Sequence, residues 1–146
     1  MEQFIKDKQL GYNSLTNFDI YDIVKQIELP NFRGVYKKNT LPKRPHRNEC
    51  GIMNFNTSNQ SGSHWVCYFK NGSQRTYFDS FGCICPIELQ RYLKTPVEFK
   101  NDIACIQRNS EQVQDPNTKI CGQLCLFVLK GLSEGEDFQS VINNLT

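Results

Sequence analysis

The sequence has only two histidines and no long run of apolar residues. A helix that crosses a membrane needs about 18 or more consecutive apolar residues, and no stretch approaches that length. The first ten residues, MEQFIKDKQL, lack the apolar core of a signal peptide. We therefore expect an intracellular protein without a membrane span. Repeats, low-complexity tracts and an internal linker are also missing, so residues 1–146 are expected to form a single domain.

Seven cysteines are present, but they do not have the spacing of a structural zinc site. Such a site usually holds paired CxxC-like motifs. The nearest approaches are Cys83 and Cys85, which are too close, and Cys121 and Cys125, which are one helical turn apart. An odd number of cysteines cannot all pair, and intracellular chains seldom hold disulfides. We expect no metal ion and mostly buried thiols, one of which serves as a nucleophile.

Helices are predicted towards both ends of the chain. One begins at Thr16, whose hydroxyl can cap it together with Asp19, and stops before Pro30. Cys121–Leu132 is apolar all round, which indicates a buried helix. A short helix is expected at residues 87–93. A final helix is expected at residues 134–145, with Ser133 as its cap.

Strands are predicted in the middle of the chain, at residues 50–56, 64–70, 75–80, 97–99 and 103–107. A polar turn at residues 58–63 separates the first two strands. Helices that flank a strand-rich middle indicate the α+β class, with a central mixed or antiparallel sheet.

Residues 32–48 form a basic segment with six cations and no acid: Arg33, Lys37, Lys38, Lys43, Arg44 and Arg47. The formal net charge of the whole chain is only +2. We expect this segment to be irregular and to be either a solvated loop or a contact for nucleic acid. No base-reading motif accompanies it, so binding there would be directed to phosphates and weakened by salt.

Asn71-Gly72 is a favoured two-residue turn for a type I′ β-hairpin. If Lys70 and Ser73 flank this turn, His64 lies directly opposite Asp79. Directly opposed side chains have Cβ atoms about 4.5–5.5 Å apart, which permits an imidazole–carboxylate hydrogen bond. The other face of the hairpin is apolar and is expected to turn to the core: Trp65, Cys67, Phe69 and Phe78.

The His64–Asp79 pair is either a surface contact without chemistry or an oriented general base, which needs a group to deprotonate. The candidate is Cys121, which precedes Gly122 and begins an apolar helix. A helix N-terminus stabilises a thiolate by only about 0.3–1 kcal/mol, so a nearby imidazolium is needed as well. His64 is the better-placed histidine, because His46 lies in the basic segment.

Acyl transfer also needs donors for the developing oxyanion, commonly a side-chain amide and a backbone N–H. Gln114 precedes Cys121 by seven residues, and a turn at Pro116-Asn117 would fold it back towards the start of the helix. Gln112 lies two positions earlier on the same side of an extended strand. Spacing alone does not choose between these two glutamines.

The order of these motifs resembles that of the adenain-like proteases, the adenovirus maturation protease family. The matching segments are His64-Trp65, Phe78-Asp79-Ser80-Phe81-Gly82, Val113-Gln114-Asp115-Pro116-Asn117 and Cys121-Gly122. The chain looks most like the virophage and polinton type of this family. The wider papain-like clan includes the ubiquitin-like-protein proteases, which have the same His-Asp-Gln-Cys order. That order is the reverse of papain's, so the arrangement is convergent.

The resemblance implies a cysteine endopeptidase with Cys121 as nucleophile, His64 as base, Asp79 as acid and Gln114 as oxyanion donor. The family context thereby favours Gln114 over Gln112. It implies cleavage of viral capsid or core precursors near small residues such as Gly, inside the host cell and in the virion. We expect a monomer that requires no cofactor.

Adenain is also activated by DNA and by a peptide that is disulfide-linked to a cysteine. By resemblance, the basic segment is the expected DNA contact and Cys105 the expected peptide contact. Two other functions remain open at this point. One is an isopeptidase that removes a ubiquitin-like modifier with the same four residues, and the other is a non-enzymatic nucleic-acid-binding protein that uses residues 32–48.

Overall fold

The computed structural model describes residues 1–55 and 64–145, so the turn predicted at residues 58–63 lies outside the described residues. The helices are α1 (Glu2–Asp7), α2 (Asn17–Gln26), α3 (Ile87–Leu93), α4 (Pro96–Lys100), α5 (Cys121–Ser133) and α6 (Phe138–Asn143). The strands are β1 (Phe32–Lys37), β2 (Asn48–Asn54), β3 (Trp65–Asn71), β4 (Gln74–Phe78) and β5 (Gln107–Arg108).

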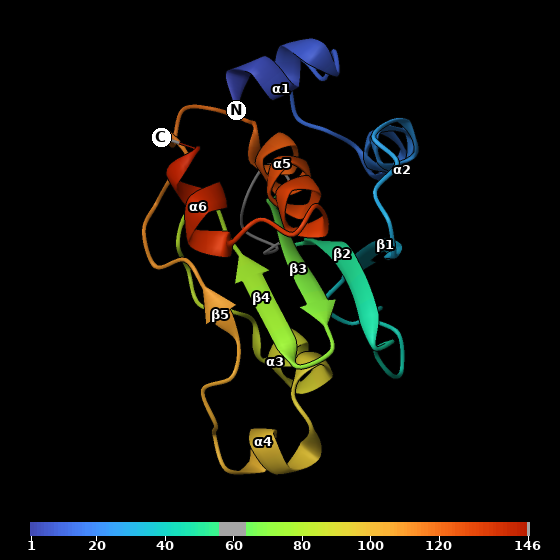
Figure 1. The fold of residues 1–146 in the computed structure, drawn as a ribbon, viewed down its shortest axis with the longest axis vertical. Helices are drawn as coiled ribbons and strands as arrows, with labels where there is room; N and C mark the ends of the chain where they lie inside the picture. The colour runs from blue at the N-terminus through green and yellow to red at the C-terminus, as the bar shows by residue number, and fades with distance from the viewer. Residues whose placement is uncertain (56–63, 146) are drawn as a thin grey trace.

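The strands form one mixed sheet in the order β1-β2-β3-β4-β5 (Figure 1). The central pairs β2–β3 and β3–β4 are antiparallel, whereas the outer strands β1 and β5 run parallel to their neighbours. Helices lie on both sides of this sheet, so the predicted α+β class is confirmed. Within the described residues, no helix is long and apolar enough to cross a membrane.

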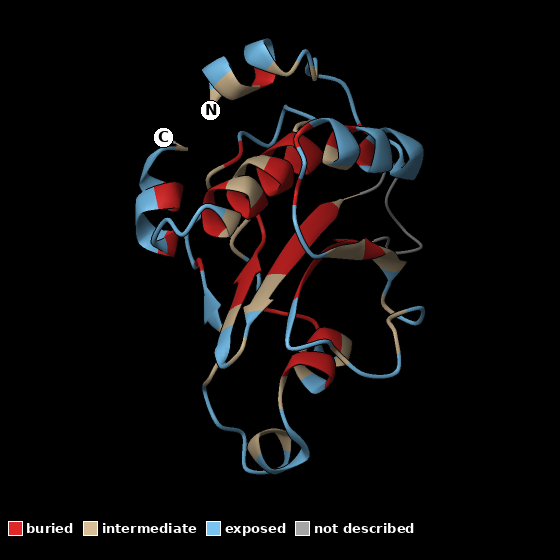
Figure 2. Cartoon of the chain, turned by 45° about the vertical axis from the view of Figure 1, so that its right-hand side comes forward, coloured by how far each residue is buried: buried red, intermediate tan, exposed pale blue. Residues whose placement is uncertain are grey.

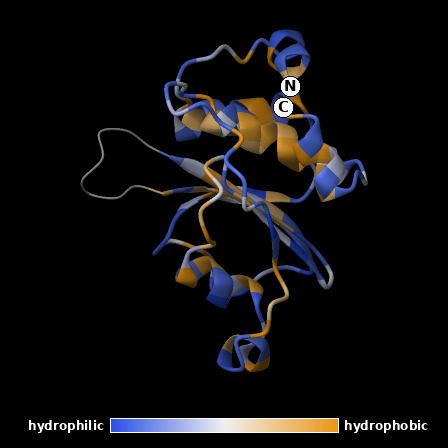
Figure 3. Ribbon diagram, turned by 90° about the vertical axis from the view of Figure 1, so that its left-hand side faces the viewer, coloured by the Kyte–Doolittle hydropathy of each residue, from blue (hydrophilic) through white to orange (hydrophobic). Residues whose placement is uncertain are grey.

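Two apolar cores lie on opposite faces of the sheet. One packs Trp65 and Phe78 against residues of α2, α5 and α6, and the other packs Val66 and Tyr68 against α3. Because β3 is covered on both faces, residues 65–68 are buried in succession rather than alternately. Figure 2 shows this burial in the central strands and in α5, and the long helix beneath the two termini in Figure 3 is largely hydrophobic.

The register of the β3–β4 hairpin differs from the prediction. Asn71 pairs with Gln74 and Cys67 pairs with Phe78, so the turn is Gly72-Ser73. Gly72 has a φ of 61°, whereas the φ of Ser73 is not positive. A type I′ turn needs a positive φ at both central residues and a type II′ turn only at the first, so the turn has the φ pattern of type II′. The pairing moves by two residues, which leaves every side chain on its predicted face. The predicted core face is therefore confirmed: Trp65, Cys67, Phe69 and Phe78 belong to one core.

Helix α2 is capped as predicted, since the Thr16 hydroxyl accepts the Asp19 N–H at 3.1 Å and the Asp19 carboxylate accepts the Thr16 N–H at 2.9 Å. Helices α3 and α5 also lie where the sequence predicts them. The predicted cap of the last helix is wrong, because Asp137 caps α6. Ser133 instead ends α5, and its hydroxyl donates to the Lys130 carbonyl at 2.7 Å.

Other expected elements are also wrong. Residues 32–37 form strand β1 rather than irregular backbone, because they pair with β2. Residues 97–99 belong to α4 rather than to a strand, since Thr95 and Glu98 form a capping box around Pro96 at the helix start. Of the strand predicted at residues 103–107, only Gln107 is paired, and it forms the short strand β5 together with Arg108. The sequence did not predict helix α1.

Candidate active site

His64, the residue before β3, lies against Asp79, the residue after β4. Its Nε2 atom is 2.7 Å from Oδ1 of Asp79. In the observed register His64 faces the position of Phe81, and the two ring centroids are 4.8 Å apart. The His64–Asp79 contact is therefore diagonal across the hairpin rather than directly opposed. The predicted contact is present although the predicted pairing is not.

The imidazole of His64 also makes a hydrogen bond with the Cys121 thiol. Because Nε2 faces Asp79, Nδ1 is the ring nitrogen left for the sulfur. Burial lowers the pKa of His64, but the hydrogen bonds with Asp79 and Cys121 outweigh burial and raise this pKa to about 9. The imidazole is thus a cation at neutral pH. An imidazolium beside a sulfur is the environment that a nucleophilic thiol requires.

Cys121 is buried at the first position of α5, where the backbone N–H of Trp65 donates to its Sγ atom at 3.4 Å. A Cβ atom at Gly122 would lie 3.0 Å from Leu15 Cδ1 and 3.2 Å from Trp65 Cδ1. The indole N–H of Trp65 is in turn held by the Leu15 carbonyl at 2.9 Å. Glycine after the cysteine therefore lets the helix start approach Trp65 closely.

Gln114 is buried in the loop that leads to α5. Its Oε1 atom accepts the Ser80 hydroxyl at 2.5 Å, and its Nε2 atom donates to the Thr118 carbonyl at 3.0 Å. A side-chain amide has two N–H donors, so one N–H remains for a ligand. Gln112, the other candidate, is exposed and donates to the Gln114 carbonyl at 2.9 Å. Burial and a fixed amide thus distinguish Gln114 from Gln112.

Sequence reasoning missed two buried residues that hold this site, Ser80 and Asn109. The Asn109 side chain makes two hydrogen bonds with the backbone of Asp79. Its Oδ1 atom accepts the Asp79 N–H at 3.1 Å, and its Nδ2 atom donates to the Asp79 carbonyl at 2.6 Å. The Asp79 carboxylate also accepts the Phe81 N–H at 2.8 Å. A separation of 30 residues along the chain leaves no local signal for the Asn109 contact.

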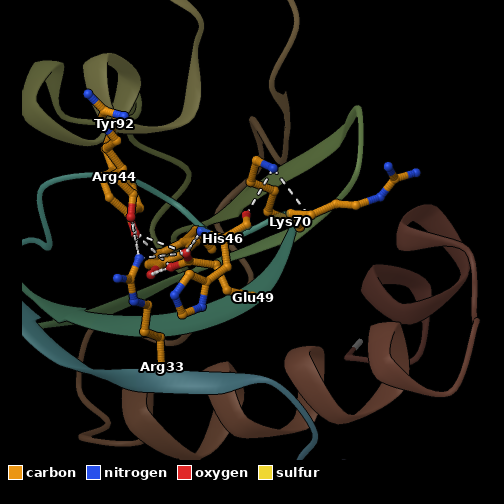
Figure 4. Close-up of polar contacts among 8 residues, drawn as sticks. Arg33, Arg44, His46, Glu49, Lys70 and Tyr92 are labelled. Atoms are coloured by element: carbon orange, nitrogen blue, oxygen red, sulfur yellow. Dashed lines mark hydrogen bonds and ion pairs between the residues drawn. The ribbon is translucent and has the colours of Figure 1, made fainter.

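The basic segment is partly neutralised by Glu49, which directly follows it (Figure 4). Nη1 of Arg33 lies 3.0 Å from Oε1 of Glu49 and 2.7 Å from the Tyr92 hydroxyl, and it also donates to the Arg44 carbonyl. Arg33 is therefore engaged within the protein. Nucleic-acid binding by the other cations stays a prediction: Lys37, Lys38, Lys43, Arg44 and Arg47.

Cys105 is half-buried after α4 and lines a small cavity of about 280 Å³ together with Cys85. No disulfide joins the described cysteines, and the bond to an activating peptide stays a prediction. Across residues 1–55 and 64–145, no three His, Cys, Asp or Glu side chains gather as they would around a metal ion.

A family model described as Adenovirus endoprotease matches residues 32–141, which is well over half of the chain. The chain belongs to the adenovirus endoprotease family. The family expected from the motifs is thereby confirmed, and the matched range contains His64, Asp79, Gln114 and Cys121.

Proteases of two adenoviruses are similar to this member of the adenovirus endoprotease family. That of porcine adenovirus A serotype 3 is 24% identical over 141 residues, which cover 88% of this chain and 69% of the relative. That of bovine adenovirus 2 is 27% identical over 111 residues, or 68% of this chain and 54% of the relative.

The fold is similar to that of the ASFV pS273R protease. Its selenomethionine crystal structure matches with a TM-score of 0.60 and 18% identity, covering 89% of this chain and 62% of that chain. A second crystal structure of the same protease gives a TM-score of 0.58. The chain therefore spans less than two thirds of the solved protein whose fold it shares.

Proposed function

We propose that the protein is a cysteine endopeptidase in which Cys121 is the nucleophile, His64 the base and Asp79 the acid that orients the imidazole. The observation that carries this proposal is the position of His64, whose imidazole contacts the Asp79 carboxylate on one side and the Cys121 thiol on the other. Membership of the adenovirus endoprotease family supports it.

In the proposed resting site His64 already holds the proton of Cys121, and the Cys121 thiolate attacks the carbonyl carbon of the peptide bond. The backbone N–H of Cys121 and the remaining N–H of Gln114 bind the oxyanion. The protonated His64 gives its proton to the leaving amine as the C–N bond breaks. Water, deprotonated by His64, then hydrolyses the thioester, which releases the Cys121 thiolate beside the His64 imidazolium. Side chains and backbone supply every donor and acceptor, so the reaction requires no cofactor.

We further propose that the substrates are viral capsid or core precursors, cut near small residues such as Gly during virion maturation. The similar proteins are proteases of two adenoviruses, which supports a viral substrate. The Trp65 indole is fixed against Gly122, the neighbour of Cys121, by its hydrogen bond to the Leu15 carbonyl. A small residue passes such a rigid ring more easily than a large one, which supports cleavage next to glycine.

The test is cleavage of a capsid precursor and of a ubiquitin-like fusion by the purified protein, followed by mass spectrometry. Cys121→Ala and His64→Ala should abolish cleavage of the precursor. His46→Ala is the matched control, because His46 makes its described hydrogen bonds through backbone atoms and should retain activity. Full cleavage by Cys121→Ala would refute the proposal. Preferred cleavage of the fusion would instead identify an isopeptidase.

A further inference from the structure

A hollow of about 750 Å³ lies beside the proposed nucleophile, between β1, the end of β2 and the residues before α2. Leu15 and Trp65 line it, and both also pack against Gly122, the neighbour of Cys121. The volume is that of a typical ligand site, about 300–1,000 Å³. A peptide advances by about 3.3–3.6 Å per residue, so a substrate held at Cys121 reaches this hollow within a few residues.

The hollow has one charged residue among those that line it, Lys37 at the end of β1. The backbone of Lys37 is held by Thr40, whose hydroxyl accepts the Lys37 N–H at 2.8 Å. No acid in the described part of the chain forms an ion pair with the Lys37 ammonium. Residues 56–63, NTSNQSGS, contain no acid either. The hollow thus offers a positive charge without an acidic side chain to neutralise it.

The other lining groups suit a peptide. Leu15, Val35 and Trp65 provide apolar walls. Further polar groups of the lining come from Ser14, Thr16, Asn17, Thr40 and Asn54. The Val35 N–H at the outer edge of β1 is already bound to the Tyr21 hydroxyl at 2.9 Å. Recognition here therefore depends on side chains rather than on an added β-strand.

We propose that this hollow binds an acidic side chain of the substrate and that Lys37 selects for it. The inference rests on the proposed function, because it concerns the substrate of the same site. The methylene groups of a glutamate contact the apolar walls, and its carboxylate pairs with the Lys37 ammonium. Since this ion pair stays open to water, we expect Glu to exceed Gln at that position by about two- to fivefold in kcat/KM.

The experiment uses a proteome-derived peptide library, whose cleaved ends are identified by mass spectrometry. The wild type should enrich Glu and Asp at one position within about four residues of the cut bond, the reach set by chain length. Lys37→Glu should enrich Lys and Arg at the same position, and Lys37→Gln should lose the acidic preference. Lys25→Glu is the matched control, because this exposed lysine on α2 gives the same change in net charge and does not line the hollow.

An unchanged acidic preference in Lys37→Glu, or no acidic preference in the wild type, overturns this inference while the cleavage itself still supports the proposed function. The same loss of preference in Lys25→Glu also overturns it, because net charge alone would then explain the effect. If no peptide is cut in a Cys121-dependent manner, the proposed function fails and this inference fails with it. Melting temperatures of the variants show whether each one is folded.

Discussion

The Ser80 hydroxyl donates a 2.5 Å hydrogen bond to Oε1 of Gln114, and both side chains are buried. The backbone repeats the contact, since the Gln114 N–H donates to the Ser80 carbonyl at 3.1 Å. An amide whose oxygen is held in this way cannot exchange its oxygen and nitrogen by rotation. Ser80 therefore fixes the orientation of the N–H group that we propose as an oxyanion donor.

Ser80→Ala should lower kcat about tenfold with little change in KM, because the oxyanion forms only in the transition state and a buried acceptor is left unsatisfied. Steady-state kinetics with a peptide substrate measure this change. Alkylation of Cys121 by iodoacetamide should keep its rate, since that reaction forms no oxyanion. Ser110→Ala, at an exposed serine, is the control. A parallel loss of alkylation would mean that Ser80 supports the whole site rather than Gln114.

Gln114→Glu should lower kcat about 100- to 1,000-fold, the usual effect of removing one oxyanion donor. The variant keeps the size of the side chain and replaces its N–H donors by an oxygen. Gln112→Glu is the matched control, and it should lose no more than about threefold because it affects only one hydrogen bond, made by an exposed residue. Equal losses in the two variants would contradict the assignment of Gln114.

The pH profile of kcat/KM should have an alkaline limb near pH 9, where the pKa of His64 lies. Activity falls as the pH rises through this value because the imidazolium is lost. Asp79→Asn removes a charge that raises this pKa, so the limb should move to lower pH. The rate should also fall about 10- to 100-fold, the value of one charge-assisted hydrogen bond. Asp22→Asn, at an exposed position on α2, should leave the limb in place; a limb that stays near pH 9 in Asp79→Asn would exclude His64 as its source.

The raised pKa of His64 also fixes how the stability of the protein depends on pH. The pKa of histidine in an unfolded chain is about 6.5, so protonation of His64 stabilises the folded state fully below that pH. This contribution disappears as the pH rises through about 9. The difference in melting temperature between the wild type and Asp79→Asn should therefore shrink between neutral pH and pH 10.

The contact between His64 and Asp79 could be predicted from the sequence even though the hairpin register was wrong. The Asn71-Gly72 sequence indicates a tight turn, but the two central residues of that turn can be Asn71-Gly72 or Gly72-Ser73. The structure has Gly72-Ser73 at the centre. The two alternatives differ by two residues in pairing, which preserves the face of every side chain. The sequence was therefore sufficient to predict that His64 and Asp79 share a face of the hairpin. The register decides only whether these two side chains meet directly or diagonally.

The parts that could not be predicted depend on contacts between distant segments. Strand β1 contains Gly34 and two cations, so its strand propensity is weak, and it is held by pairing with β2 and by the Arg33–Glu49 ion pair. Asn109 and Ser80 are ordinary polar residues until the fold brings them to Asp79 and Gln114. Helix α4 is different, because its Thr95/Glu98 capping box was visible in the sequence and outweighed the strand propensity of residues 97–99.

The buried carboxylate of Glu49 joins four segments of the fold. It lies 3.0 Å from Nη1 of Arg33 and accepts hydrogen bonds from the Tyr68 hydroxyl at 2.5 Å, the Tyr92 hydroxyl at 2.8 Å and the His46 N–H at 2.5 Å (Figure 4). Burial and this carboxylate raise the pKa values of Tyr68 and Tyr92, so both hydroxyls remain donors at all ordinary pH values. Glu49 is thus an acceptor surrounded only by donors.

Glu49→Gln should therefore lower the free energy of unfolding by about 2–4 kcal/mol, because an amide N–H would face donors and Arg33 would lose its partner. The side chain of Arg33 is 22% exposed, which keeps the loss below that of a fully buried pair. Urea denaturation measures the change, and Glu98→Gln, which breaks the Arg75–Glu98 pair nearer the surface, should cost only about 0.5–1 kcal/mol. Removing the cation as well, in Glu49→Gln with Arg33→Gln, should restore part of the stability; a double variant as unstable as the sum of its single variants would show that the two charges do not interact.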